Sequence, residues 1–280
     1  MKGAAATERS PDKGRRMEKG IHGHGAASVL DRFRLDGLTA LVVGAGPGIG
    51  AHVARAFAEV GANVVVSARS SGRMSALAAE INAGGGSARA VAGDAGKADD
   101  LERLVCEAED AFGPVQVLFF NAATGPIPIT SEPFAADDAV WEAAVAVNML
   151  APYRLAKRVV PGMKAAGYGS IINLLTCAAF QPILPQMAYG ATKAGLHMLT
   201  RYIAKGGAPE VRANCICPGS MSPDGVTSPN FAEHLKKNAI PRTGLSDEVV
   251  GAALLLAAPA SSYSTGQVIF CEGGRVNTIS

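Results

Sequence analysis

The sequence predicts a doubly wound α/β domain, in which a seven-stranded, mostly parallel sheet is covered by helices on both faces. Short runs rich in β-branched residues alternate with longer segments that have the length and composition of helices. This alternation implies right-handed β-α-β crossovers, which place the strands parallel in one sheet. The sequence has no repeat of fixed period and no run of about 18 apolar residues, so neither a repeat protein nor a membrane-spanning helix is expected.

The expected strands are apolar runs of four to seven residues. In chain order they are Ala40–Val43, Asn63–Ser67, Ala88–Ala92, Val115–Asn121, Ser170–Leu175, Val211–Ile216 and Gln267–Phe270. The expected helices are the longer segments between these runs. They are His52–Val60, Ser75–Ala83, Ala98–Phe112, Val140–Met163, Ala188–Lys205 and Asp247–Ala257.

The formal charge of +2 is unevenly distributed along the chain. Residues 1–34 hold eight basic and four acidic residues, whereas the remaining 246 hold 18 basic and 20 acidic ones. Because residues 1–34 contain few hydrophobes, we expect a flexible N-terminal extension. Residues 35–280 are enough for a single domain with a full core. The irregular stretch Ser220–Asn238, which turns helical at Phe231–Lys237, predicts a lid over a ligand crevice at about residues 220–240.

Charge and cysteine content exclude several classes of protein. A body of charge −2 without basic clusters argues against a nucleic-acid binder. Residues 1–30 lack the apolar stretch of a secretory signal. The five cysteines are odd in number and show no C-x-x-C spacing, so free thiols in a reducing compartment are expected and no metal site is predicted. We therefore expect a cytoplasmic protein without nucleic-acid or membrane partners.

A glycine-rich loop follows the first expected strand and opens the first helix. It reads Gly44-Ala45-Gly46-Pro47-Gly48-Ile49-Gly50. Such a turn lets backbone amides approach a pyrophosphate, and the helix N-terminus adds donors and a favourable dipole. No Gly-Lys-Ser/Thr follows, so it is not a Walker A loop. The loop predicts a dinucleotide site, with a ligand-free strand–helix turn as the alternative.

The end of the second expected strand indicates which dinucleotide binds. An acid about twenty residues after the glycine loop usually binds the ribose 2′-hydroxyl of NAD. Here the chain reads Ser67-Ala68-Arg69 instead. Arg69 offers a charge-assisted fork for a 2′-phosphate, with a solvated loop arginine as the alternative. The missing acid favours NADP(H) over NAD(H).

Tyr189 and Lys193 are four residues apart at the start of an expected helix and therefore share one face. A neighbouring ammonium favours the phenolate and lowers the tyrosine pKa from its usual value of about 10. Such a phenol can give or take a proton at a carbonyl or alcohol oxygen. The spacing alone is common, and an exposed helical pair is the alternative.

Further motifs occur in a fixed order along the body. They are Asp94 after the third expected strand, Asn121-Ala122 after the fourth, Asn148, Thr176 thirteen residues before Tyr189, Pro218-Gly219 after the sixth, and the closing Gly266–Gly274. With the glycine loop and the Tyr189/Lys193 pair, they resemble the classical short-chain dehydrogenase/reductase family from about Leu35 to Gly274. The resemblance implies a Rossmann fold and an NADP(H)-dependent oxidoreductase acting on a small carbonyl compound or secondary alcohol.

The same resemblance implies a role for each matched residue. Tyr189 would be the general acid in reduction and the base in oxidation, while Lys193 would lower its pKa and hold the nicotinamide ribose. Thr176 would polarise the substrate oxygen, and Asn148 would hold a water in a proton relay through Lys193. The expected cofactor contacts are Gly44, Gly46, Gly48, Ile49, Gly50, Arg69, Asp94, Asn121, Ala122, Tyr189, Lys193, Pro218 and Gly219. The family also implies a homotetramer, or a homodimer, through the helices that carry Asn148 and Tyr189.

Four positions depart from the family pattern. Thr176 matters most, because it stands where a serine is usual. Its hydroxyl keeps a donor and an acceptor, but its methyl restricts χ1 and narrows the site. We expect a working enzyme with an altered substrate pocket. The other departures are Val43, the run Phe120–Ala123, and Pro223.

Two other functions stay open. One keeps the fold but makes the protein a dehydratase, an epimerase or an imine reductase. The other is a cofactor-binding scaffold or regulator without turnover, against which the intact Tyr189, Lys193 and Asn148 count. The expected walls of the substrate pocket are Thr124–Phe134, Cys177–Met187 and Ser220–Asn238, which favour an apolar or mixed pocket.

Overall fold

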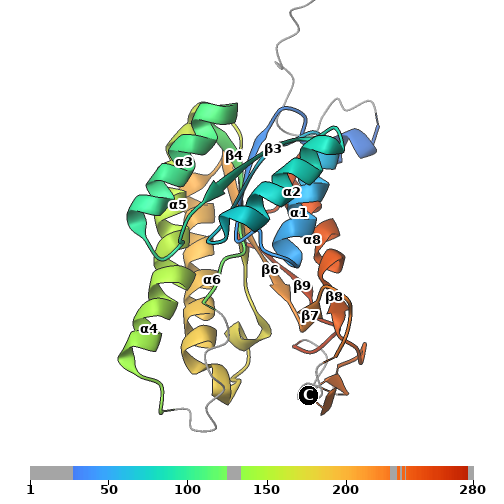
Figure 1. The fold of residues 1–280 in the computed structure, drawn as a ribbon. Coiled ribbons are helices and arrows are strands. Elements are labelled where there is room, and N and C mark those ends of the chain that lie inside the picture. Colours follow the sequence, from blue (N-terminus) through green and yellow to red (C-terminus); the bar gives the residue numbers. More distant parts are fainter. Residues whose placement is uncertain (1–27, 125–133, 228–231, 234, 237, 277–280) are drawn as a thin grey trace, which may run out of the picture.

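A computed structural model of the chain describes residues 28–124, 134–227, 232–233, 235–236 and 238–276. Seven strands form one sheet in the order β3-β2-β1-β4-β5-β6-β9, and every neighbouring pair is parallel (Figure 1). Their bounds are β1 Thr39–Val43, β2 Asn63–Ala68, β3 Ser87–Ala92, β4 Val115–Phe120, β5 Gly169–Leu174, β6 Val211–Pro218 and β9 Val268–Cys271. The predicted seven-stranded sheet is confirmed, and all of its pairings are parallel.

Helices cover both faces of the sheet, as the sequence predicts (Figure 1). One layer comprises α1 (Ile49–Glu59), α2 (Ser71–Ala83) and α8 (Val250–Ala257). The opposite layer comprises α3 (Ala98–Phe112), α4 (Asp138–Val145), α5 (Ala151–Ala165) and α6 (Met187–Gly207). Short 3-10 turns lie at Leu30–Phe33, Cys177–Ala179, Leu184–Gln186, Ser246–Val249 and Pro259–Ser261. No helix among the described segments is both long enough and apolar enough to cross a bilayer.

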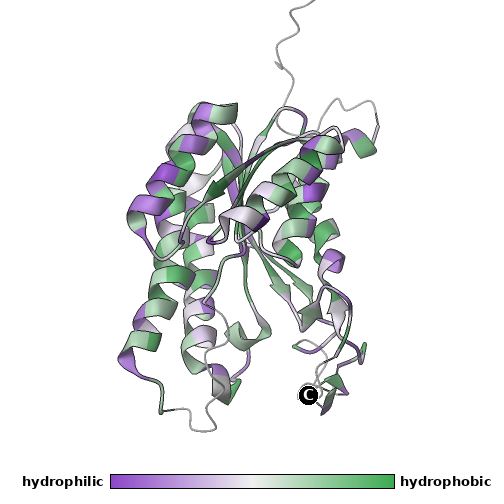
Figure 2. Cartoon of the chain, viewed as in Figure 1, coloured by the Kyte–Doolittle hydropathy of each residue, from purple (hydrophilic) through white to green (hydrophobic). Residues whose placement is uncertain are grey.

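Side-chain alternation along the strands divides the core between the two faces. On β1, Ala40 and Val42 pack toward α1, α2 and α8, whereas Leu41 and Val43 pack toward α3 and α5. The strands are mainly hydrophobic, while α3 carries many hydrophilic residues (Figure 2). Because both faces of the sheet are covered, the strands read as continuous apolar runs rather than as alternating patterns.

The sheet order reverses between β1 and β4, and this reversal positions the site. Strands β2 and β3 lie on one side of β1, and β4, β5, β6 and β9 lie on the other. The connections that leave β1 and β4 therefore diverge to opposite faces, which opens a crevice at the carboxyl ends of these strands. The glycine loop follows β1 and Asn121 follows β4, so both lie at this crevice.

Three local features differ from the sequence prediction. The expected single helix Val140–Met163 is divided into α4 and α5 by a π-helical turn at Ala146–Leu150. A small second sheet pairs β7 (Met221–Ser222) with β8 (Gly244–Leu245), and the sequence had predicted neither strand. Residues 1–27 of the expected extension lie outside the described residues, as do residues 231, 234 and 237 of the expected helix at Phe231–Lys237, while Ala232, Glu233 and Leu235 are helical.

A buried arginine closes the C-terminal end of α8. Arg212 on β6 donates from Nη2 to the carbonyls of Leu256 (3.0 Å) and Ala258 (3.3 Å), and from Nη1 to Ser261 Oγ (2.7 Å). Tyr168 donates its hydroxyl proton to the carbonyl of Ala257. The last carbonyls of a helix lack partners within the helix, and a cation there also complements the helix dipole.

Replacing Arg212 by methionine should destabilise the fold, because it removes the charged donor of three buried hydrogen bonds. We expect the free energy of unfolding of Arg212→Met to fall by about 2–4 kcal/mol. Urea unfolding followed by circular dichroism measures it. Arg89→Met, on the exposed part of β3, is the matched control and should stay within about 0.5 kcal/mol of the wild type. Equal losses in the two variants would contradict this assignment.

Candidate active site

The glycine loop is closed on one side and open on the other. Gly44 has φ +88°, and a Cβ there would collide with the backbone of Ala122. A Cβ on Gly50 would collide with the carbonyl of Gly44, so α1 lies directly against the turn. At Gly46, by contrast, a Cβ would meet no atom within 4 Å. Close backbone packing therefore requires the outer glycines, while Gly46 leaves open space for a ligand.

Helix α1 starts immediately after this turn. Gly48 is its N-cap with φ +113°, and Ile49 is its first residue. The N-cap residue has no side chain that could accept a hydrogen bond, so the backbone N–H groups of the first turn are left without such a cap. An anion at this end would accept hydrogen bonds from them and interact favourably with the helix dipole.

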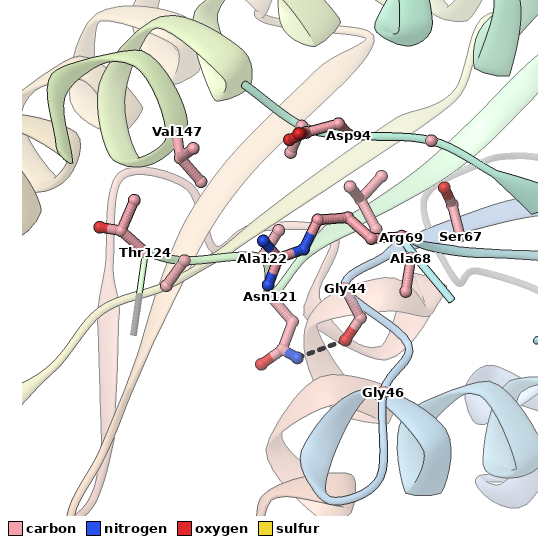
Figure 3. A pocket seen from close by; sticks show the side chains of 14 residues that line it. Gly44, Gly46, Ser67, Ala68, Arg69, Asp94, Asn121, Ala122, Thr124 and Val147 are labelled. Carbon is pink, nitrogen blue, oxygen red and sulfur yellow. Dashed lines mark hydrogen bonds between the residues drawn. The ribbon is translucent and has the colours of Figure 1, made fainter. Parts of the chain in front are cut away.

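Asn121 ties the glycine loop to the end of β4. Its Nδ2 donates to the carbonyl of Gly44 at 2.6 Å (Figure 3). The backbone N–H groups of Asn121 and Ala122 donate to the carbonyl of Val43 at 2.8 and 3.0 Å. In this structure the Asn-Ala motif therefore fixes the shape of the loop.

A cavity of about 560 Å³ lies beside the loop at the carboxyl ends of β1, β2, β3 and β4 (Figure 3). Six of the residues expected to contact the cofactor line it, namely Gly44, Gly46, Arg69, Asp94, Asn121 and Ala122. Thr124, which the sequence placed in the wall of the substrate pocket, also lines this cavity, and the lining residues that were not predicted as contacts are Val43, Ser67, Ala68, Gly93, Ala95, Ala123 and Val147. Several of these directly follow a strand in the sequence, which is the signal that could have found them.

Two charged side chains reach this cavity. The guanidinium of Arg69 extends into it from the end of β2, and Asp94 borders it from the end of β3 (Figure 3). Asp94 Oδ1 accepts a hydrogen bond from the backbone N–H of Gly96 at 2.9 Å, which fixes the carboxylate. Arg69 is exposed and forms no ion pair with any residue in the described part of the chain.

Lys193 is buried on α6, one turn after Tyr189. Its Nζ donates to the carbonyl of Leu174 at 2.6 Å and lies 5.9 Å from the centroid of the Tyr189 ring. Burial lowers the pKa of Lys193 to about 8. The predicted helical pair is thus an interior pair, and the exposed alternative is wrong for Lys193.

Tyr189 is linked to Thr176 at the end of β5. Burial raises the pKa of the phenol to about 12, and a hydrogen bond with the Thr176 side chain opposes this rise. The sequence had predicted a pKa lowered by Lys193, but burial dominates in this structure. Thr176 is held in place because its Oγ1 also accepts from the backbone N–H of Ala178 at 3.4 Å.

Asn148 lies in the π-helical turn and is completely buried. Its Nδ2 donates to Thr192 Oγ1 at 3.0 Å and to Thr124 Oγ1 at 3.4 Å. Its Oδ1 accepts from the backbone N–H of Thr124 at 3.3 Å. Asn148 therefore connects the segment that follows β4 to α6. Its contact on α6, Thr192, is the residue directly before Lys193. The sequence had placed Thr124 in the wall of the substrate pocket, whereas Thr192 was missed, although it precedes Lys193 in the chain.

Pro218 and Gly219 lie at the end of β6 and outside the lining of the first cavity. A Cβ on Gly219 would come within 2.8 Å of Glu272 Cα, so the chain packs tightly here. Gly219 lines a second cavity of about 380 Å³, together with Met221 and Glu272. The structure thus brings the catalytic candidates together but separates Pro218-Gly219 from the cavity beside the glycine loop.

A parallel sheet with a glycine turn at its reversal point, and a half-buried tyrosine one helical turn before a buried lysine, define a Rossmann-type oxidoreductase. A family model described as "Enoyl-(Acyl carrier protein) reductase" matches residues 44–275. The chain belongs to the classical short-chain dehydrogenase/reductase family.

Known proteins similar to this chain act on different substrates. Galactitol 2-dehydrogenase (L-tagatose-forming) of Cereibacter sphaeroides is 34% identical over 250 residues, which cover 86% of this chain and 96% of the relative. A gluconate 5-dehydrogenase from Burkholderia cenocepacia, solved with NADP and tartrate, has a TM-score of 0.81 at 32% identity and covers 89% of this chain and 98% of its own. A 7 alpha-hydroxysteroid dehydrogenase, solved with NADH and 7-oxo glycochenodeoxycholic acid, has a TM-score of 0.82 at 31% identity. The match covers 90% of this chain and 99% of that chain.

The lowered pKa of Lys193 predicts a pH-dependent contribution to stability. Between its folded pKa of about 8 and its ordinary value of 10.5, the unfolded chain holds a proton that the folded chain has released. The free energy of unfolding of the wild type should therefore rise with pH in this window, relative to Lys193→Met. The slope is at most about 1.4 kcal/mol per pH unit. Urea unfolding at stepped pH measures it.

The neighbouring groups do not obscure this difference. Tyr189 and Cys215 face Lys193, and burial raises the pKa of each to about 12, so both stay protonated across most of the window. Lys157→Met, on the exposed face of α5, is the matched control. Its free energy of unfolding should change with pH in the same way as that of the wild type. A constant difference between wild type and Lys193→Met would show that the ammonium is not destabilised by burial.

Proposed function

We propose that this protein is an NADP(H)-dependent oxidoreductase that transfers hydride between the nicotinamide and a small carbonyl compound or secondary alcohol. One observation carries the proposal: the half-buried Tyr189 interacts with Thr176, and Lys193 Nζ lies 5.9 Å from the centroid of its ring. This trio provides a proton donor, a second hydroxyl and a cation at the carboxyl ends of the central strands. Such a group can protonate and polarise an oxygen atom while the adjacent carbon gains hydride.

The residues present fit a dinucleotide. The open space at Gly46 and the first turn of α1 offer backbone donors to a pyrophosphate. The cavity of about 560 Å³ extends from there to Arg69 and Asp94, which would hold the adenosine end. Lys193 would hold the ribose hydroxyls next to the nicotinamide. When bound, the cofactor supplies or accepts the hydride.

The residues of the chain divide the proton chemistry among them. In reduction, Tyr189 gives its proton to the substrate oxygen, and its raised pKa keeps it protonated at neutral pH. Thr176 donates to the same oxygen as negative charge develops there. The Lys193 ammonium, 5.9 Å from the ring, stabilises the resulting phenolate. Asn148 fixes the π-helical turn against α6, and its predicted water relay remains part of this proposal.

Arg69 supports NADP(H) as the cofactor. The structures of similar proteins contain NADP in one case and NADH in the other, so the family alone does not decide. In this chain the guanidinium extends into the cavity, and no carboxylate stands at the end of β2 (Figure 3). A 2′-phosphate would pair with Arg69, whereas a free 2′-hydroxyl would lack its usual acidic partner.

The assembly and location form a further part of the proposal. Leu150, Tyr153, Met198 and Tyr202 are apolar side chains on the helical segments around Asn148 and Tyr189, and each is at least 40% exposed. Such a patch supports a homotetramer, or a homodimer, built through these helices. All five cysteines are free, which supports a reducing, cytoplasmic location. We further propose that residues 35–280 form one domain, with a lid at about residues 220–240.

Arg69→Ala should weaken binding of NADPH and leave that of NADH nearly unchanged. Loss of a charge-assisted hydrogen bond to phosphate costs about 1.5–3 kcal/mol, so the KM for NADPH should rise about 10-fold to 100-fold. Steady-state kinetics with both cofactors measures the ratio. Arg89→Ala, outside the cavity, is the control and should leave both KM values unchanged. A preference of the wild type for NADH would refute the cofactor assignment.

Thr176→Val removes the hydroxyl at nearly constant shape. We expect kcat to fall about 100-fold to 1,000-fold, as when one donor to a developing oxyanion is lost. Thr176→Ser keeps the hydroxyl and should retain most of the activity, which separates chemistry from packing.

Tyr189→Phe should abolish measurable turnover of a panel of ketones and aldehydes with NADPH. Undiminished turnover of Thr176→Val would refute its role, and NADPH binding without turnover by the wild type would favour a scaffold.

A further inference from the structure

Four of the five cysteines converge at one end of the sheet. Cys215 and Cys217 lie on β6, Cys271 ends β9 in register with Pro218, and Cys177 follows β5 by three residues. Three of them, Cys177, Cys215 and Cys217, belong to one buried cluster with Leu175 and Leu196. The mechanism proposed above uses none of these thiols.

Within this group, Cys177 and Cys217 form a pair. Both side chains lie in this buried cluster, where their thiols interact, and Cys177 Sγ donates to the carbonyl of Pro218, the residue after Cys217, at 3.7 Å. The hydrogen bond from Cys217 lowers the pKa of Cys177, whereas that bond and burial raise the pKa of Cys217. Cys215 is differently placed, because it is hydrogen-bonded to Thr200 and burial raises its pKa to about 12. Cys177 is therefore the thiol best able to react as a thiolate, with Cys217 in contact with it.

We propose that Cys177 and Cys217 form a reversible disulfide, with a hydroperoxide as the oxidant, and that this bond switches off the adjacent site. The Cys177 thiolate attacks one peroxide oxygen, so an S–O bond forms, the O–O bond breaks, and the departing oxygen takes a proton. The Cys217 sulfur then attacks the resulting sulfenic sulfur, so the S–S bond forms, the S–O bond breaks, and the departing hydroxyl takes the Cys217 proton and leaves as water. Two thiols are oxidised and one hydrogen peroxide is reduced to two waters.

The pair lies close enough to the site to affect it. Cys177 directly follows Thr176, and negative charge on Cys177 or Cys217 raises the pKa of Tyr189. Disulfide formation brings the two sulfur atoms to about 2.05 Å, and we expect the turn that contains Cys177 to shift toward β6 when the bond forms. The turn that contains Cys177 packs tightly on α6, since a Cβ on Gly190 would come within 2.7 Å of the Ala178 carbonyl. Movement of this turn therefore displaces Thr176 relative to Tyr189.

The burial of the pair favours a small oxidant. Cys177 is 4% exposed and Cys217 is fully buried, while Thr176, next to Cys177 in the chain, is partly exposed. We expect a molecule close to water in size to reach Cys177 past Thr176, whereas larger alkylating reagents are disfavoured. Cys106, exposed on α3, serves as an internal control for general thiol oxidation.

The test combines a mass measurement with an activity measurement on the full chain. The reduced protein is treated with hydrogen peroxide, quenched with an alkylating reagent and digested with trypsin, which releases residues 165–193 and 213–236 as separate peptides. We expect these peptides to become disulfide-linked, with fragmentation placing the bond at Cys217 rather than Cys215. Turnover should fall at least about tenfold through displacement of Thr176, and dithiothreitol should restore it.

Variants make the assignment specific. Cys177→Ser and Cys217→Ser should form no cross-link and keep most of their turnover in peroxide, whereas Cys106→Ser should behave like the wild type. The absence of the cross-link under conditions that oxidise Cys106 would overturn the inference. So would a cross-link that leaves turnover undiminished. The inhibitory effect rests on the proposed function, but the cross-link is read by mass. If the protein reduced no carbonyl compound but still formed the cross-link, the proposed function would be refuted and the proposed disulfide would be supported.

Discussion

The side chain of Asn148 joins three segments on which the site depends. It lies in the π-helical turn between α4 and α5, and it bonds Thr124 after β4 and Thr192 on α6. Thr192 stands immediately before Lys193, and Thr124 borders the cavity beside the glycine loop. One buried amide therefore links the cavity beside the glycine loop to the helix that carries Tyr189 and Lys193. Because the group is fully buried, an unpaired Asn148 amide would be costly, which makes this arrangement strongly preferred.

Burial shifts the two ionisable groups of the site in opposite directions. It raises the pKa of Tyr189 to about 12 and lowers that of Lys193 to about 8, so each is pushed toward its neutral form. No carboxylate in the described part of the chain forms an ion pair with Lys193, and its Nζ is satisfied by the Leu174 carbonyl. A phenol held in its protonated form is well placed to act as an acid. In the oxidative direction the same phenol must lose its proton, which higher pH favours.

The sequence predicted those parts of the fold that local pattern determines. The strands are continuous apolar runs because both sheet faces are covered, and the glycine loop is readable because Gly44 and Gly48 need positive φ. The π-helical turn was missed, since its residues have ordinary helical composition and the extra residue in the turn is set by tertiary contacts of Asn148. The pairing of β7 with β8 was missed because two-residue strands carry no periodicity. The contact between Cys177 and Cys217 joins segments forty residues apart and has no local signal.

The threonine at position 176 restricts how the site can share its hydrogen bonds. A hydroxyl has one proton and two acceptor positions. Thr176 Oγ1 uses one acceptor position for the backbone N–H of Ala178, and it also bonds the phenol of Tyr189. Its single proton can point to Tyr189 or to a substrate oxygen, but not to both. When the Thr176 proton points to a substrate oxygen, the phenol of Tyr189 can donate its own proton to the same oxygen. Because the β-branched side chain has a restricted χ1, this exchange occurs by rotation of the hydroxyl proton alone, without movement of heavy atoms.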